Sequence, residues 1–307
     1  MGPRRTSLVL MCEQRLVVAL SSRALFDLRE EAAIFESEGL EAYLALQRSR
    51  SQEPLRPGVA FPLVRRLLGL NQAGEEPLVA VILASRNDPV TGARVMRSIE
   101  AMGLTIETAC FTAGAPVPPY LSAFGVDLFL SAEPEDVAAA QAGGVAAAVV
   151  LEHDLEDLRP DDPVIRIAFD GDSTLWGESA DRVFQTGGLK AFHDHEQANG
   201  KVPLEKGPFT GFLQALCLLQ RRLEKPELVR TSLVTARAVV AHARALATLE
   251  HFGLHVDEAF FLGGRDKTEV LQAFGADFYD SPRFALPASR VVPTGRVLRQ
   301  LDGGRIK

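Results

Sequence analysis

The sequence predicts an α/β fold in which mostly parallel strands are covered by helices on both faces. Short, mainly apolar runs at residues 78–84, 165–169 and 228–234 are typical of strands that are buried on both faces of a sheet. Segments with apolar residues at helical spacing separate such runs, and the one at 90–102 is followed by Gly103, a common residue at helix ends. This alternation of strands and helices favours a parallel sheet.

The expected elements of the first half follow one another at short intervals. An apolar run at 14–20 predicts the first strand, and a helical pattern over 30–47 is interrupted by Gly39. A polar segment with prolines at 49–58 predicts a loop. The remaining expected elements are helices at 61–70, 90–102 and 119–124 and strands at 78–84, 107–112 and 127–130.

The second half repeats the first at an offset of about 150 residues. Segments in the two halves match in order and in letters, and the offset is kept along the chain, which chance similarity between helices or strands would not do. We therefore predict two tandem, homologous units at 1–153 and 163–307, joined by the acidic segment 152–162. The matching pairs are 34–43 with 183–192, 54–58 with 203–207, 101–111 with 251–261, and 122–129 with 272–279.

Composition narrows the function classes. The 307 residues are 47% hydrophobic and carry a net charge of −7, which argues against a nucleic-acid polymer as partner. No apolar run is long enough to span a membrane, and the apolar part of the first eleven residues is short for a signal peptide. Three widely spaced cysteines in apolar surroundings, Cys12, Cys110 and Cys217, predict buried thiols in a reducing compartment. A soluble, cytoplasmic protein is expected.

Two acids follow the strand expected at 165–169. Asp170 and Asp172 are separated only by Gly171, and the carboxyl ends of strands in open α/β sheets are where ligands bind. Two carboxylates there, with a glycine that lets the backbone approach a ligand, make metal-assisted phosphoryl transfer the first hypothesis. The alternative interpretation is an ordinary polar turn after a strand.

The repeat provides an internal comparison for these acids. Four of five polar residues of the second half fall opposite residues of different chemistry in the first half, whereas glycines and aromatic residues are shared. This contrast predicts a catalytic second unit and a non-catalytic first unit that serves as scaffold or regulatory part. The pairs are Asp170 with Ser21, Asp172 with Arg23, Thr235 with Ser85, Lys267 with Val117, and Asp280 with Leu130.

The order of these residues resembles the four motifs of the haloacid-dehalogenase-like phosphohydrolases, which implies Rossmann-like parallel sheets of that type. More narrowly, the chain resembles the cytosolic 5′-nucleotidase type I family along nearly its whole length. The similar stretches are residues 21–27, 57–62, 166–172, 207–212, 234–237 and 257–262. The resemblance implies Mg²⁺-dependent hydrolysis of nucleoside 5′-monophosphates, commonly AMP, to nucleoside and phosphate, and it suggests a homo-oligomer.

The resemblance also implies the roles of the motif residues. Asp170 would be the nucleophile that forms an aspartyl-phosphate, and Asp172 would be the general acid and base. Thr235 would hydrogen-bond a phosphoryl oxygen, and Lys267 would neutralise charge on the phosphoryl group and Asp170. Mg²⁺ would bind a carboxylate oxygen of Asp170, the backbone carbonyl of Asp172, and Asp280. Without the motif order, Lys267 could equally be a solvated lysine at a helix start, and Thr235 a helix cap.

One position departs from the family pattern. The last motif usually ends in two adjacent acids, and here Ser281 follows Asp280. A serine could hold a metal-bound water, so we expect Mg²⁺ binding that is weaker or differently tuned rather than an inactive site. Asp277 is a poorer substitute, because its counterpart in the first half is also an acid, Asp127.

Residues 174–206 lie where this superfamily inserts a cap, and they predict two helices, at 179–186 and 189–198. We expect the cap to close over the substrate and exclude water. The expected substrate contacts are Arg237, His195, Gly207 and Phe209. Arg237 could instead form a salt bridge, and His195, like His193 and Glu196, could lie on a solvated helix face.

Three functions remain compatible with the sequence. The first is a Mg²⁺-dependent nucleotidase that acts on nucleoside monophosphates through Asp170. The second is a nucleotide-binding regulatory or scaffold protein with little turnover, an alternative kept open by Ser281. The third is a phosphatase of the same superfamily for a non-nucleotide phosphomonoester. The presence of Asp170, Asp172, Thr235 and Lys267 together favours catalysis.

Overall fold

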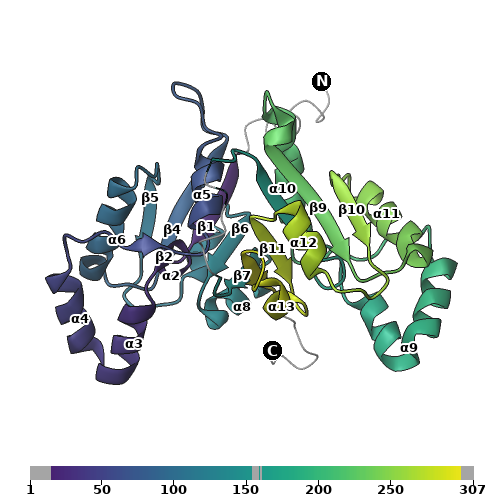
Figure 1. Ribbon diagram of the computed structural model, residues 1–307, viewed down its shortest axis with the longest axis horizontal. Coiled ribbons are helices and arrows are strands. Elements are labelled where there is room, and N and C mark those ends of the chain that lie inside the picture. The colour runs from purple at the N-terminus through teal and green to yellow at the C-terminus, as the bar shows by residue number, and fades with distance from the viewer. Residues whose placement is uncertain (1–14, 154–158, 160, 299–307) are drawn as a thin grey trace, which may run out of the picture.

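The computed structural model describes residues 15–153, 159 and 161–298. Its centre is one ten-stranded sheet with the order β10-β9-β8-β11-β12-β7-β6-β1-β4-β5, seen edge to edge in Figure 1. The short strands β2 (Phe26–Asp27) and β3 (Arg56–Pro57) form a separate antiparallel pair. Cys12 and most of the segment 154–160 lie outside the described residues, so the expectations for them are not addressed by the structure.

The strands of the first half form five neighbours in the order β5-β4-β1-β6-β7. All of their pairings are parallel, for example Val18 opposite Val81 and Leu128. The burial of every residue of β1 explains why its sequence is continuously apolar. The bounds are β1 Leu16–Leu20, β4 Val79–Ser85, β5 Thr108–Phe111, β6 Leu128–Ser131 and β7 Ala146–Val150.

The strands of the second half have the corresponding order β10-β9-β8-β11-β12, again with parallel pairings only. The two sets meet where β7 and β12 pair antiparallel, with Gly295 opposite Val150. The halves therefore share a continuous sheet instead of forming separate ones. The bounds are β8 Ile165–Phe169, β9 Val229–Thr235, β10 Glu258–Phe261, β11 Phe278–Ser281 and β12 Thr294–Arg296.

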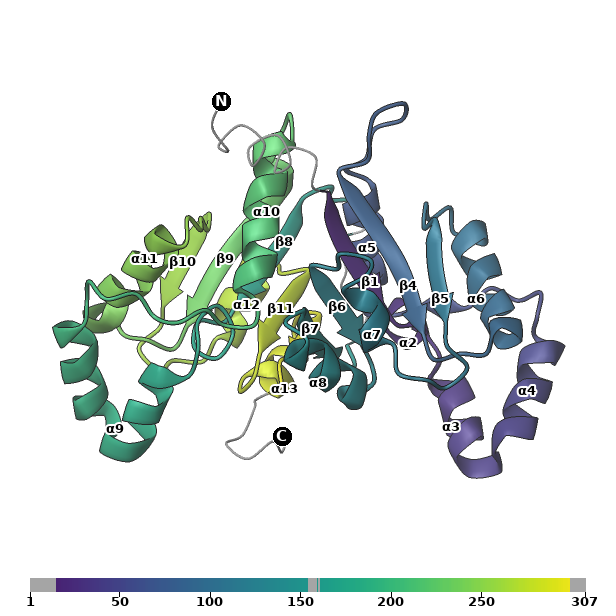
Figure 2. The same cartoon turned by 180° about the vertical axis from the view of Figure 1, so that it is seen from behind.

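Helices cover both faces of this sheet. Figure 1 shows α5 of the first half in front of the sheet. Figure 2, the view from behind, shows α10 of the second half in front of the opposite face. The helices of the first half are α2 Ser22–Leu25, α3 Arg29–Glu38, α4 Leu40–Ser49, α5 Phe61–Leu68, α6 Pro89–Ala101, α7 Pro118–Leu121 and α8 Pro134–Ala142. Those of the second are α9 Ser179–Ala198, α10 Thr210–Arg222, α11 His242–His251, α12 Thr268–Phe274 and α13 Ala285–Ala288, with short 3₁₀ turns at Pro226–Leu228 and Val239–Ala241.

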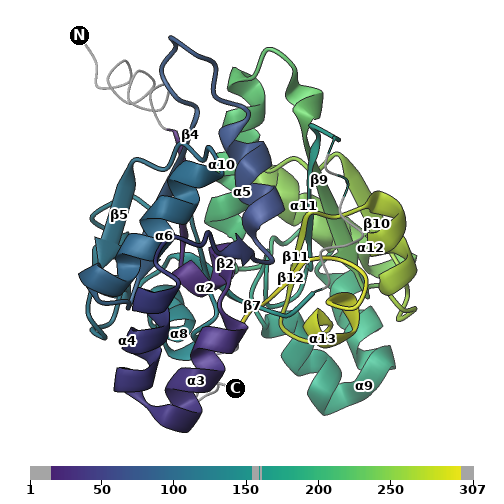
Figure 3. The ribbon, with the colours of Figure 1, turned by 60° about the vertical axis from the view of Figure 1, so that its left-hand side comes forward.

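A bent helix pair occurs in each half. The helix expected over 30–47 is divided into α3 and α4 at Gly39, whose φ of 84° is open to glycine at little cost. In α9 the same bend lies at Gly188, with φ 71°. Figures 1 and 3 show both pairs projecting from the same end of the molecule. The pair α3–α4 thus takes the same place in the first half as α9 takes in the second.

The halves exchange contacts across the centre of the sheet. Helix α10 contacts β1 and β7, and α5 contacts β8. From α5, Arg66 reaches into the second half, where its guanidinium forms a buried ion pair of 2.7 Å with Asp277. The Asp277 carboxylate also accepts a hydrogen bond from the backbone N–H of Arg166, at 2.7 Å. Asp277 is therefore already bound by other groups of the protein, consistent with its being a poor metal ligand.

No helix in the described part of the chain is long and apolar enough to cross a membrane.

Candidate active site

The candidate site lies where β8, β9 and β11 end side by side. Asp170 directly follows β8, Thr235 is the last residue of β9, and Asp280 lies in β11 opposite Phe169. The backbone N–H of Asp170 donates to the carbonyl of Asp280 at 3.1 Å, so the two acids are anchored to each other through the main chain. Parallel neighbours present their carboxyl ends together, which is why residues far apart in sequence meet here.

Asp170 is held on both carboxylate oxygens. The ammonium of Lys267 lies 2.6 Å from Oδ1, which also accepts from the N–H of Gly171 at 2.8 Å. The Ser281 hydroxyl donates to Oδ2 at 2.7 Å. Lys267 is 1% exposed and its ammonium also donates to the Tyr279 hydroxyl, at 3.1 Å. The interpretation of Lys267 as a solvated helix-start lysine is therefore wrong.

Asp280 is fully buried, and neither of its carboxylate oxygens has a hydrogen-bond partner among the described residues. Burial raises the pKa of Asp280 well above its ordinary value, and the nearby charge of Asp170 raises it further. An unpartnered buried carboxylate beside a second carboxylate is the environment that a bound cation would relieve, and oxygen donors suit Mg²⁺. No group of three or more His, Cys, Asp or Glu side chains in the described chain could hold a metal. The predicted set of two side chains and one backbone carbonyl needs no such group.

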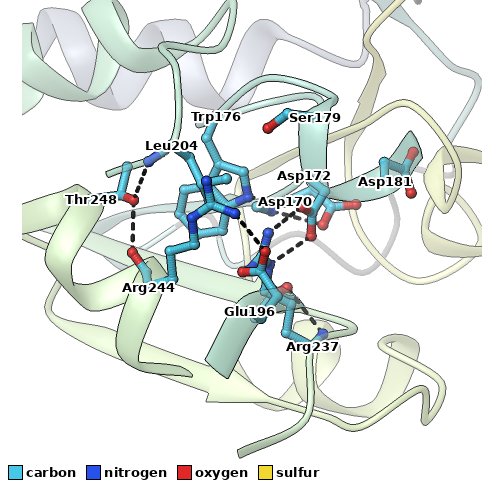
Figure 4. A network of polar contacts seen from close by, with 12 residues as sticks. Asp170, Asp172, Trp176, Ser179, Asp181, Glu196, Leu204, Arg237, Arg244 and Thr248 are labelled. Carbon is cyan, nitrogen blue, oxygen red and sulfur yellow. Dashed lines mark hydrogen bonds and ion pairs between the residues drawn. The ribbon is translucent and has the colours of Figure 1, made fainter. Parts of the chain in front are cut away.

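Asp172 points to a different partner. Its carboxylate is bidentate with the Arg237 guanidinium, at 2.7 and 3.0 Å, and accepts from the indole N–H of Trp176 at 3.0 Å. Burial alone would raise the pKa of Asp172, but the charge and hydrogen bonds of Arg237 outweigh it and lower that pKa. In the arrangement described, Asp172 is thus held as a carboxylate (Figure 4).

Arg237 lies between the strand ends and helix α9. Its side chain is 1% exposed and forms an ion pair with Glu196 of α9. The guanidinium lies 5.3 Å from the ring centre of Trp176 and 5.4 Å from that of Phe192. The backbone N–H of Arg237 donates to the hydroxyl of Thr235 at 3.2 Å. The salt-bridge interpretation of Arg237 is confirmed, and the residue also borders the cavity described next.

A cavity of about 390 Å³ opens between these strand ends and α9, within the size range of small-molecule sites. Asp170 and Asp172 are among its lining residues, and most of the remaining wall is apolar. An ion pair between Asp181 of α9 and Arg283, which follows β11, links the two walls. Other lining residues are Phe184, Leu189, Phe192, His193, Arg237, Gly263, Gly264 and Phe284.

Three of the four predicted substrate contacts do not line this cavity. His195 instead lies 3.2 Å from the Arg244 guanidinium. Phe209 is fully buried and packs edge-on against Phe212, so it serves the core. Gly207 lies against the backbone of residues 174–176, behind the loop that carries Asp172. Sequence alone did not show that these residues lie away from the cavity, because neither residue type nor motif position specifies what packs around a residue.

Replacing Gly207 with Ala should destabilise the loop that follows Asp172. A Cβ at this position would lie 2.3 Å from the carbonyl oxygen of Thr174 and 2.7 Å from the N of Trp176, so backbone would have to move. We expect a lower melting temperature and reduced turnover, measured by thermal unfolding and phosphate release.

The matched control for that change is Gly211→Ala, within α10. A Cβ there would meet nothing within 4 Å, and alanine favours helix by about 1 kcal/mol over glycine. The control should keep activity and melt at the same or a higher temperature. Equal behaviour of the two variants would show that the close approach at Gly207 has no consequence.

The corresponding strand ends of the first half lack this chemistry. The hydroxyls of Ser22 and Ser85 hydrogen-bond each other at 3.0 Å. Arg23 pairs with Glu133 at 2.6 Å, and Val117 and Leu130 are buried in the core. No acid stands at the positions of Asp170, Asp172 or Asp280.

Comparison with known proteins agrees with this geometry. The family model described as 5′-nucleotidase matches residues 9–302. The chain belongs to the 5′-nucleotidase family. This is a family of phosphoric monoester hydrolases. The chain is also 35% identical to the human protein "Cytosolic 5′-nucleotidase 1B" over 270 residues, which cover 83% of this chain and 44% of the relative. It thus spans less than half the length of that relative. No solved structure matches.

Some residues of the site had another role, or none, predicted from the sequence. Ser281 was considered as a metal-water ligand, whereas here it donates to Asp170. Arg244, Asp181 and Arg283 carried no prediction. A signal for Arg244 was present in the repeat, since Arg94 stands at the same place in the first half.

Proposed function

We propose that this protein is a Mg²⁺-dependent 5′-nucleotidase that hydrolyses nucleoside 5′-monophosphates, AMP foremost, through an aspartyl-phosphate on Asp170. The observation that carries the proposal is the environment of that carboxylate: a buried ammonium at 2.6 Å and, beside it, the unpartnered Asp280. Family membership and the name of the human relative support the nucleotide as substrate.

In the proposed first step, a carboxylate oxygen of Asp170 attacks phosphorus and the bond from phosphorus to the 5′-oxygen breaks. Asp172 gives its proton to the leaving 5′-oxygen. In the second step a water attacks the phosphorus of the aspartyl-phosphate and gives a proton to Asp172, which frees Asp170 and phosphate. Since both oxygens of Asp172 accept hydrogen bonds from Arg237 in the structure, one of them must give up its bond to carry the proton, while the other can keep its contact with the guanidinium.

The surrounding residues have supporting roles in this proposal. Lys267 balances charge that builds up between Asp170 and the phosphoryl oxygens, and the hydroxyl of Thr235, at the end of the strand that pairs with β8, would donate to one of them. Asp170, Asp280 and the Asp172 carbonyl would hold Mg²⁺, which when bound supplies positive charge against the repulsion between two anions.

Helix α9 acts as the cap in this proposal. Its aromatic residues Phe184 and Phe192 line the cavity opposite the strand ends, and the Asp181–Arg283 ion pair joins it to the segment after β11. An apolar wall would accept the base and ribose and exclude water from the phosphoryl group. The first unit, 1–153, would be the non-catalytic partner of the catalytic unit, 163–307. A cytoplasmic site of action is proposed from the name of the relative.

The test is phosphate release from a panel of ribo- and deoxyribonucleoside monophosphates and sugar phosphates, with Mg²⁺ and with a chelator. The proposal expects turnover of at least one nucleotide, AMP among the best, that stops when the metal is removed. Turnover of sugar phosphates alone would favour the non-nucleotide phosphatase. Nucleotide binding without phosphate release would favour the regulatory or scaffold alternative.

A further inference from the structure

Four charged side chains of alternating sign run from helix α11 to the catalytic loop. Arg244 of α11 lies 2.8 Å from one carboxylate oxygen of Glu196, and the other oxygen pairs with Arg237. Arg237 in turn holds Asp172 through two hydrogen bonds, at 2.7 and 3.0 Å. Figure 4 shows these side chains pointing toward one another from separate elements. Glu196 is 1% exposed, so its charge is balanced by the two guanidiniums and not by water.

The first half contains the structural part of this network without its catalytic end. Arg94 donates from Nε to the Glu53 carbonyl at 2.9 Å, as Arg244 does to the Val202 carbonyl at 2.9 Å. A second hydrogen bond is also common to both halves. The Ser98 hydroxyl accepts from the N–H of Leu55, and the Thr248 hydroxyl accepts from the N–H of Leu204. The fold therefore uses this arginine as an anchor in both halves.

The difference between the halves lies at the position of Glu196. Its counterpart in the first half is Gln47, only 3.4 Å from Arg94, and Arg94 takes its charge partner from Glu31 instead, at 2.7 Å. The counterpart of Arg237 is Asn87, and that of Asp172 is Arg23. An anchor arginine can thus be neutralised without a carboxylate at this place. The carboxylate occurs only where Arg237 and Asp172 occur.

We propose that Glu196 is a positioning residue for the general acid: it fixes Arg237, and Arg237 fixes the direction of the Asp172 side chain. Because Glu196 lies on α9, it ties the placement of Asp172 to the position of the cap helix. Glu196 is not itself among the residues that line the cavity in which substrate would bind. This inference rests on the proposed phosphatase function and extends it to a residue outside the cavity.

The test compares Glu196→Gln with Gln47→Leu, which removes the hydrogen-bond acceptor at the matching place of the first half. For Glu196→Gln we expect kcat for a nucleoside monophosphate to fall about 10- to 100-fold, with KM changed less than about threefold, because a misplaced acid slows chemistry without weakening binding. Gln47→Leu should leave both constants unchanged. Thermal unfolding of both variants controls for folding, and if Glu196→Gln does not fold, Glu196→Asp takes its place.

A second substrate separates positioning from general damage. p-Nitrophenyl phosphate has a leaving group that departs without a proton, so in single-turnover release of the leaving group, which reports only the first step, the Glu196→Gln defect should shrink to less than about threefold with it. An equal loss with both substrates, a rise in KM at unchanged kcat, or no loss at all would overturn the inference. If the wild type does not hydrolyse the aryl ester, the inference is tested by the nucleotide alone: kcat of Glu196→Gln should fall while its KM changes little. A wild type without any phosphatase activity would refute the proposed function, and the positioning role that rests on it would fall with it, whereas an active wild type with an unaffected Glu196→Gln variant would refute the positioning role alone.

Discussion

Replacing Asp170 with Asn is expected to lower kcat for a nucleoside monophosphate by at least about 10⁴-fold. An amide cannot act as the nucleophile that accepts the phosphoryl group, and losses of this order follow removal of a covalent nucleophile. The change keeps the size of the side chain, and the amide oxygen can still accept the hydrogen bond from the Gly171 N–H, so folding should survive. Phosphate release with Mg²⁺ present measures the loss, and thermal unfolding checks the fold.

The control for Asp170→Asn is the same position in the first half, Ser21. Its hydroxyl accepts hydrogen bonds from the N–H groups of Ala24 and Ala132, at 3.2 and 3.3 Å. Ser21→Ala should cost about 1 kcal/mol of stability as a lost helix cap and leave turnover within about twofold. Retention of a few per cent of activity by Asp170→Asn would place the nucleophile elsewhere. Loss of activity in Ser21→Ala would mean that the first half takes part in the chemistry.

The meeting of Asp170, Lys267 and Asp280 could be predicted from sequence because the physics of parallel sheets is simple. Each residue stands at or just after an apolar strand or at a helix start, and such strands present their carboxyl ends together. The internal repeat added what a single motif cannot, since it showed that the fold tolerates Ser21, Val117 and Leu130 at the same places.

Side-chain direction was the part that could not be predicted. Phe209 and Gly207 belong to a motif-like stretch, but one is buried in the core and the other lies against backbone. The ion pair of Asp172 with Arg237 depends on rotamers that bring together residues 65 positions apart. Ser281 shows the same limit: its residue type suggested a water ligand, and its position makes it a donor to Asp170.

The centre of the sheet was also beyond sequence patterns. Strand β7, Ala146–Val150, begins with three alanines, which favour helix and have little strand preference. Its partner β12 is the short segment Thr294–Arg296, with Gly295 at its middle. Gly295 is required by packing, because a Cβ there would lie 2.4 Å from the ring of Phe278 and 2.6 Å from Ala148. Contacts across the two halves, and not local preference, select these strands.

Replacing Asp280 with Asn should have opposite effects on stability and on activity. Both carboxylate oxygens of Asp280 are buried without hydrogen-bond partners among the described residues and lie near a second carboxylate, so a negative charge on Asp280 is unfavourable in the metal-free protein. Its pKa is raised on folding, so its contribution to stability is fully present below the ordinary pKa of 3.8 and is lost as pH rises through the raised value. The amide removes this charge. The metal-free variant should therefore melt at or above the wild-type temperature at pH 7.

With Mg²⁺ bound, the wild type should instead melt at a higher temperature than the Asp280→Asn variant. A ligand that binds only the folded state stabilises it by about 2.7 kcal/mol at one hundred times its dissociation constant, so Mg²⁺ should raise the melting temperature of the wild type. The Asp280→Asn variant should show little or no such shift, and its turnover should fall about 100-fold or more, because one of the predicted metal ligands is gone. Thermal unfolding with Mg²⁺ and with a chelator, together with phosphate release, measures both effects.

Asp277→Asn is the matched control, since it changes a second buried acid of the same segment. Its loss leaves the buried guanidinium of Arg66 without its partner at 2.7 Å, and breaking a buried pair in this way costs about 3–5 kcal/mol. This variant should melt below the wild type while keeping the Mg²⁺-induced shift. If Asp280→Asn instead melted lower without metal and still responded to Mg²⁺, Asp280 would be a structural acid like Asp277, and the cation would have to bind through other groups.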